Sequence, residues 1–231
     1  MERKAYLLAG PTASGKSAIA ACLAREMGAR ILSADSMLVY SGMDIGTAKP
    51  SKEEIAEFGM GGLDVVTPAD EFSSGAWLRA AAEWVREIPE ETPVVIVGGT
   101  GLYFSALLRG LDRKWVKPPP EYPVLLVDRA VLRERIAKRL DEMFANGLDG
   151  EKRRLHEQYP QFSRTAALAI GYRDGDSKEK IFTRTCQLAK RQMTWFRHQA
   201  TPIWVEPTVD AVRECWRKHG PWKVEFGCRD D

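Results

Sequence analysis

Short apolar runs alternate along the chain with longer stretches in which apolar residues recur every three or four positions. We expect strands at five of these runs, mostly bounded by Gly, Pro or Asp: Tyr6–Ala9, Ile31–Ala34, Val94–Val97, Val124–Val127 and Ile203–Val205. Runs that are apolar throughout are typical of parallel strands covered by helices on both faces. The alternation therefore predicts an α/β fold in which βαβ units build a parallel sheet.

The longer stretches predict four amphipathic helices, at Ser17–Met27, at Ser74–Ile88, around Leu132–Met143 and at Lys178–His198. Asp128 is placed to cap the third helix, and Asn146-Gly147 to end it. Consecutive prolines fit neither a helix nor a central strand, so residues 112–123 are predicted to be a linker. We expect one domain over residues 1–231.

Composition narrows the classes of protein to consider. Hydrophobic residues make up 44% and charged residues 29% of the 231 positions, which is typical of a folded domain and excludes wholesale disorder. With 34 Lys and Arg against 32 Asp and Glu, only local clustering can indicate a nucleic-acid partner. Four cysteines without CxxC or CxxH spacing exclude a zinc finger. We expect no membrane span and a cytoplasmic location.

The first predicted strand runs into GPTASGKS, Gly10–Ser17, which matches the phosphate-loop pattern GxxxxGK[ST] and opens a helix. Gly10 and Gly15 let the backbone wrap around a phosphate, whose charge the loop N–H groups and the helix N-terminus favour. Lys16 adds a full positive charge, and the Ser17 hydroxyl can hold Mg²⁺. The pattern predicts a P-loop NTPase-like sheet with Mg²⁺ as a cofactor.

Asp35 ends the second predicted strand, and the carboxyl ends of parallel strands open on the ligand crevice. Bound phosphates repel a carboxylate, so its position indicates that Asp35 acts on a second substrate. A cap for the following turn is the alternative. Asp128 follows a later strand, where a nucleotide hydrolase or kinase places a metal ligand. A helix cap is the alternative for Asp128.

Five segments resemble, in order, the motifs of bacterial tRNA dimethylallyltransferases: GPTASGKS (10–17), SADSMLVYSGMDIGTAKP (33–50), GGTGLYFSALLRGL (98–111), IGYRD (170–174) and LAKRQMTWFR (188–197). This family transfers an isopentenyl group from dimethylallyl diphosphate to N6 of adenosine 37 in tRNA. The resemblance implies a P-loop domain with a reduced helical lobe.

The resemblance implies that the phosphate loop holds the diphosphate of the prenyl donor and not ATP. Asp35 matches the general base that acts on the N6 amino group, with Thr100 and Lys16 as further catalytic residues. Arg139 matches the diphosphate-binding arginine of the pattern RIxxR, while the role of Arg135 stays open. The implied diphosphate site comprises Gly10, Thr12, Ala13, Ser14, Gly15, Lys16, Ser17 and Arg139.

The acceptor adenosine is implied to be extruded from the anticodon loop before it reacts. Residues 36–49 would line its route, and basic residues of the late helix would meet RNA phosphates. The implied tRNA-binding residues are Ser36, Met37, Tyr40, Asp44, Gly46, Thr47, Lys49, Lys190, Arg191 and Arg197. The alternative for the basic helix face is plain exposure to solvent.

The chain departs from the family in two places. Only residues 112–122 stand where most members carry a helical insertion, and Met37-Leu38 replaces Arg-Gln. Both departures concern the grip on RNA, so an adenylate isopentenyltransferase acting on free AMP, ADP or ATP remains an alternative. A P-loop small-molecule kinase and a non-catalytic RNA-binding protein are further alternatives. We expect a monomer.

Overall fold

A six-stranded sheet forms the centre of the protein in the computed structural model, which describes residues 2–110, 121–173, 175–199 and 201–226. Five strands are parallel and lie in the order β2-β3-β1-β4-β5. Their bounds are β1 Glu2–Ala9, β2 Arg30–Ser33, β3 Val94–Gly98, β4 Tyr122–Leu125 and β5 Pro202–Val205. All five predicted strands are thus confirmed, with ends shifted by a few residues.

The sixth strand, β6 (Trp222–Glu225), was missed by the sequence analysis. It pairs antiparallel with Glu2–Ala5, the first half of β1, whereas Tyr6–Ala9 pair with β3. Trp222 and Val224 are buried while Lys223 is exposed, so the segment has the alternation of a half-buried strand.

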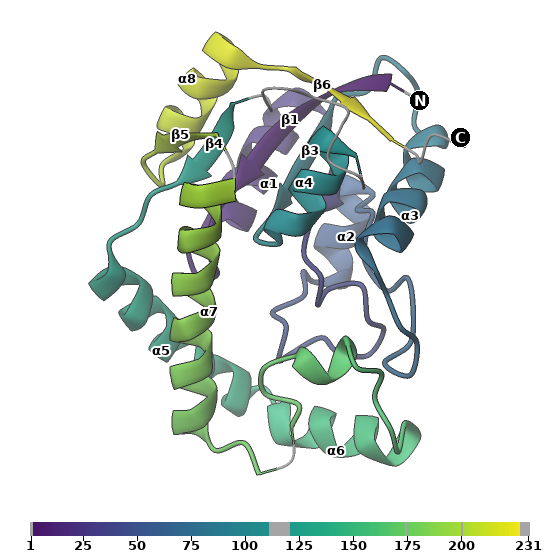
Figure 1. Cartoon of the computed structure of the whole chain (residues 1–231), viewed down its shortest axis with the longest axis vertical. Coiled ribbons are helices and arrows are strands. Elements are labelled where there is room, and N and C mark those ends of the chain that lie inside the picture. The colour runs from purple at the N-terminus through teal and green to yellow at the C-terminus, as the bar shows by residue number, and fades with distance from the viewer. Residues whose placement is uncertain (1, 111–120, 174, 200, 227–231) are drawn as a thin grey trace.

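Helices cover the two faces of the sheet (Figure 1). α1 (Lys16–Met27) contacts α2 (Lys52–Phe58) and α8 (Val209–His219), while α3 (Ser74–Arg86) contacts α4 (Gly101–Arg109), which contacts α7 (Lys178–Gln199). Figure 1 shows α4 in front of the sheet and α1 behind it. The predicted P-loop type of doubly covered parallel sheet is confirmed. No helix in the described ranges is long and apolar enough to cross a membrane.

The chain leaves the sheet after β4 and returns to it at β5. The excursion consists of α5 (Arg129–Ala145), α6 (Leu148–Gln158), the short 3₁₀ helix η1 (Ala166–Leu168) and α7, of which α5 packs against α6 and α7. In Figure 1 these elements form a lobe at one end of the sheet. As predicted, Asp128 caps α5, because its Oδ1 accepts a hydrogen bond of 2.7 Å from the Ala130 N–H.

The predicted linker needs a correction at its C-terminal end. Residues 112–120 lie outside the described residues, but Tyr122 and Pro123 belong to β4, a strand between β1 and β5. The Leu126 N–H donates to Val205 of β5 and the Tyr122 N–H to Thr201 directly before it, so the missing N–H of Pro123 faces β1. Pairing with β1 starts only at Val124, and the proline therefore interrupts no ladder bond.

Candidate active site

The phosphate loop follows β1 and has the conformation that its glycines predict. Gly15 adopts φ 90° directly before α1, and the Ile19 N–H donates to the Gly15 carbonyl over 3.2 Å. A Cβ on Gly10 would lie 2.9 Å from the Ser14 hydroxyl, so a larger residue would distort the loop. The free N-terminus of α1 therefore opens beside the loop, as anion binding requires.

Three cationic side chains gather around this loop. Lys16 Nζ donates to the Pro11 carbonyl over 3.3 Å, and Arg139 Nη2 donates to Thr12 Oγ1 over 2.7 Å. Arg135 Nη1 donates to the Ser14 carbonyl over 3.1 Å, so this residue, whose role the sequence left open, contacts the loop. Burial lowers the pKa of Lys16 from 10.5 to about 8, although the Asp35 carboxylate opposes this shift. The loop is thus surrounded by positive charge, which favours the binding of an anion.

Asp35 lies directly beyond the carboxyl end of β2, where its carboxylate is held by the next turn. Its Oδ1 accepts a hydrogen bond of 2.9 Å from the Met37 N–H. Thr100, at the start of α4, accepts a bond of 2.9 Å from the Ser36 N–H and donates one of 3.2 Å to the Ser36 hydroxyl. The turn after β2 and the turn after β3 are therefore fixed to each other beside Asp35.

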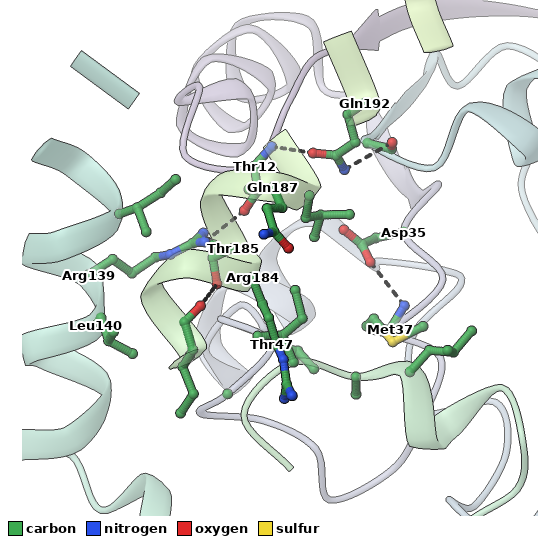
Figure 2. A pocket seen from close by; sticks show the side chains of 18 of the residues that line it. Thr12, Asp35, Met37, Thr47, Arg139, Leu140, Arg184, Thr185, Gln187 and Gln192 are labelled. Atoms are coloured by element: carbon green, nitrogen blue, oxygen red, sulfur yellow. Dashed lines mark hydrogen bonds between the residues drawn. The ribbon is translucent and has the colours of Figure 1, made fainter. Parts of the chain in front are cut away.

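One cavity of about 650 Å³ joins the phosphate loop to Asp35. Figure 2 shows Asp35 and Arg139 reaching toward it from opposite sides, with Arg184 on a further wall. Its lining includes nine residues predicted from the sequence: Thr12, Asp35, Ser36, Met37, Gly46, Thr47, Thr100, Arg139 and Arg191. Arg173, Arg184 and Gln192 line it as well and were not assigned to the site beforehand. The cavity thus combines cations, one carboxylate and an apolar wall that includes Ile136, Leu140 and Leu168.

The loop that carries Gly46 and Thr47 is held from α6. Glu151, 4% exposed, accepts hydrogen bonds from the N–H groups of Ile45 (2.9 Å) and Gly46 (3.2 Å). The Tyr172 hydroxyl donates to Glu151 over 2.5 Å, and burial followed by this bond raises the pKa of Tyr172. A Cβ on Gly46 would lie 2.7 Å from the Tyr172 ring. Only glycine fits here, and the lobe therefore positions this wall of the cavity.

Two of the predicted tRNA contacts need correction because their side chains are buried. The Tyr40 ring is 1% exposed and its hydroxyl donates to Thr165 Oγ1 over 2.6 Å. The Lys49 side chain is 3% exposed and its ammonium donates to Asp44 and Asp64, each over 2.6 Å. Both residues hold the loop in place and offer no surface to RNA, and the exposed Asp44 faces Lys49.

The basic residues of α7 separate into three positions. Arg184 lines the cavity, Lys190 lies in an open groove along α7 beside Trp195 and His198, and Arg191 lines both. Arg197 lies 6.0 Å from the ring of Trp204 in β5, away from the cavity. A single basic face was predicted, and only part of it reaches the cavity.

Metal binding would depend on the substrate. In the part of the chain that the structure describes, no three His, Cys, Asp or Glu side chains come together as a metal site. The exposed hydroxyl of Ser17 on the first turn of α1 is an oxygen ligand of the kind that Mg²⁺ accepts beside substrate phosphates. The donor set fits an ion that is shared with a bound diphosphate.

The comparisons with known proteins agree on one family. A model described as IPP transferase matches residues 38–123 and 115–199, and one described as isopentenyl transferase matches residues 3–60. A tRNA dimethylallyltransferase from Phenylobacterium zucineum is 42% identical over 171 residues, which cover 71% of this chain and 56% of that protein. One from Stenotrophomonas maltophilia is 31% identical over 90% of this chain and 94% of its own length.

The alignment with the Stenotrophomonas relative spans 299 positions, more than the 231 residues of this chain, because the relative carries residues without a counterpart here. Solved structures have the same fold. A tRNA delta(2)-isopentenylpyrophosphate transferase from Staphylococcus epidermidis superposes with a TM-score of 0.79 at 25% identity, covering 93% of this chain and 99% of that one. The full-length tRNA isopentenylpyrophosphate transferase from Bacillus halodurans gives 0.76 at 26% identity, covering 94% of both.

Proposed function

The chain belongs to the IPP transferase family, and from this premise we propose that it transfers the dimethylallyl group of dimethylallyl diphosphate to N6 of adenosine 37 in tRNA. The observation that carries the proposal is the shared cavity, in which Asp35 faces the phosphate loop and Arg139. A carboxylate beside a phosphate site is repelled by the phosphates, so its place there is explained best by a proton that it takes from the acceptor.

The reaction needs a base because the lone pair of an exocyclic adenine amine is delocalised into the ring. The N6 nitrogen forms a bond to C1 of the donor as the bond from C1 to the diphosphate oxygen breaks. Asp35 accepts the N6 proton, and general base catalysis of this kind contributes about 10²- to 10⁴-fold. The hydrogen bond from the Met37 N–H holds one carboxylate oxygen and leaves the other to face N6.

Negative charge grows on the leaving diphosphate, and this chain surrounds it with donors. Loop N–H groups at the start of α1, the Lys16 ammonium and the Arg139 guanidinium are placed to stabilise it. Ser17 would hold Mg²⁺, which when bound neutralises part of the diphosphate charge. The pKa of Lys16 is lowered by burial in the free protein, and a bound diphosphate would favour its charged form.

The acceptor side has room and charge for a nucleotide extruded from an RNA loop. Arg173, Arg184 and Arg191 line the cavity, where they would meet RNA phosphates, although Arg184 also pairs with Asp176. Gly46 and Thr47 would face the flipped base.

The proposal is tested by incubating the protein with Mg²⁺ and labelled dimethylallyl diphosphate, and offering in parallel an anticodon stem-loop with adenosine 37 and free AMP. Label in the stem-loop, and none in AMP, is the expected result. Label in AMP alone would overturn the tRNA assignment, and label in neither would overturn the transfer reaction. A stem-loop with guanosine at position 37 serves as the matched control.

A further inference from the structure

Gln192 of α7 connects the two turns that flank the transfer site, and no motif assigned it a role. Its Oε1 accepts a hydrogen bond of 2.8 Å from the Thr12 N–H in the phosphate loop. Its Nε2 donates one of 3.1 Å to the Gly99 carbonyl in the turn after β3. Figure 2 shows both bonds at the edge of the cavity.

Gln192 bonds to the two turns beyond the point where β1 and β3 pair with each other. The last β1–β3 contact is the bond of 3.2 Å from the Gly10 N–H to the Gly98 carbonyl. Thr12 lies in the turn beyond β1, where its N–H donates to Gln192 Oε1 and not to a strand. After β3 the chain enters α4 and offers no strand acceptor here. Gln192 accepts the hydrogen bond of the Thr12 N–H in its place.

Glycines in the turn after β3 make room for α7. A Cβ on Gly99 would lie 2.4 Å from Gln192 Nε2, and a Cβ on Gly101 would lie 2.1 Å from the Trp195 ring. At Gly101 a side chain would collide with the Trp195 ring, and at Gly99 it would displace the Gln192 amide. The two glycines therefore let α7 approach closely enough for Gln192 to bond to Gly99.

We propose that Gln192 is a positioning residue that sets the separation between the donor and the base. One end of its amide holds Thr12, whose hydroxyl accepts from Arg139, and the other holds Gly99, which precedes Thr100. Thr100 in turn fixes the Ser36 turn beside Asp35. The inference rests on the proposed function, since it concerns the distance between donor C1 and the N6 atom that Asp35 deprotonates.

Loss of this bridge should slow the transfer step more than it weakens donor binding. The phosphate loop keeps Lys16 and its N–H groups in a Gln192→Ala variant, so KM for the donor should change by less than about threefold. A misplacement of about 1 Å can cost about 100-fold, so kcat should fall about 10- to 100-fold. Gln192→Glu should also be slow, because its carboxylate would face the Gly99 carbonyl. Gln161→Ala, at an exposed glutamine remote from the cavity, is the control.

The closing experiment is a double-mutant cycle in single-turnover transfer to the stem-loop. Gly99→Ala should slow transfer strongly in the natural sequence and clearly less in the Gln192→Ala background, because the shorter side chain frees the space for the new Cβ. Additive effects of the two changes, or a Gln192→Ala kcat within about twofold of the natural protein, would overturn the inference. If the natural protein transfers no label at all, the proposed function fails instead.

Discussion

The phosphate loop and the loop from Asp44 to Lys49 line the same cavity, but different kinds of interaction hold them. The phosphate loop is shaped by its own backbone, through Gly15 in the left-handed region and the first turn of α1. The second loop depends on side chains more than a hundred residues away, above all Glu151 and Tyr172. The phosphate loop thus takes its backbone shape locally, although Arg139 and Gln192 also contact it. The second loop combines the local ion pairs of Lys49 with contacts from the lobe.

The largest effect is expected at the carboxylate between the two loops. Asp35→Asn removes the base but keeps an oxygen for the Met37 N–H, so kcat should fall about 10²- to 10⁴-fold. Donor affinity, measured by calorimetry, should stay the same or improve, because a negative charge near the diphosphate is lost. A single-turnover rate close to that of the natural protein would contradict the assignment of Asp35.

A change confined to the donor side should come next in size. Lys16→Met should lower kcat/KM for the donor about 100-fold and leave RNA affinity unchanged. Because burial lowers the Lys16 pKa to about 8, the free natural protein should lose kcat/KM as the pH rises through that value, since the neutral amine attracts the diphosphate less. The Lys16→Met profile should lack this decline. A decline that persists in the variant would assign it to another group.

A change confined to the acceptor side should be smaller and should separate the two loops. Glu151→Ala leaves the Ile45 N–H and the Tyr172 hydroxyl without their acceptor and the Gly46 N–H with the Tyr172 oxygen alone, which should cost about 1–3 kcal/mol of unfolding free energy. KM for the stem-loop should rise while KM for the donor stays constant. Glu157→Ala, at an exposed position of the same helix, is the control for both measurements. Equal loss on both substrates would show that the loops are not independent.

The smallest effect is expected at the open groove along α7. Lys190→Ala should weaken stem-loop binding severalfold and lower the slope of log K against log salt by about 1, if Lys190 meets one phosphate. Lys218→Ala on the distant α8 removes an equally exposed charge and should leave the slope unchanged. Identical slopes for both variants would remove the open groove from the RNA interface.

Sequence reasoning succeeded where the determinants are local. The parallel strands, the phosphate loop and the cap at Asp128 are each specified within about ten residues, and the motif resemblance added Arg139. It failed where a contact joins distant segments. Nothing near Glu151 distinguishes it from the exposed Glu157, because burial comes from Tyr172 and the loop at Ile45. Tyr40 was misjudged for the same reason, because its hydroxyl donates to Thr165, 125 residues away. Lys49 was misjudged although its partners Asp44 and Asp64 lie close in the sequence.

Some missed elements lack a local signal of their own. Seven of the nine residues of α4 are buried, and a short, mostly apolar run of this kind is hard to tell from a buried strand by its sequence. β6 has only four residues and needs the first half of β1 as its partner. Gln192 stands in a recognised motif, but its sequence neighbours Arg191 and Lys190 are equally polar, and only the approach of α7 to Gly99 sets it apart.

α7 is long enough that a rotation of the helix displaces its two ends by different amounts. Fourteen residues separate Gln192, anchored at the sheet, from Lys178, whose ammonium pairs with Asp141 of α5 over 2.6 Å. At 1.5 Å per residue this arm is about 21 Å long, so a tilt of about 10° at the anchor moves its far end by about 4 Å. A small rotation of the helix beside the phosphate loop would therefore be amplified at the end that contacts α5.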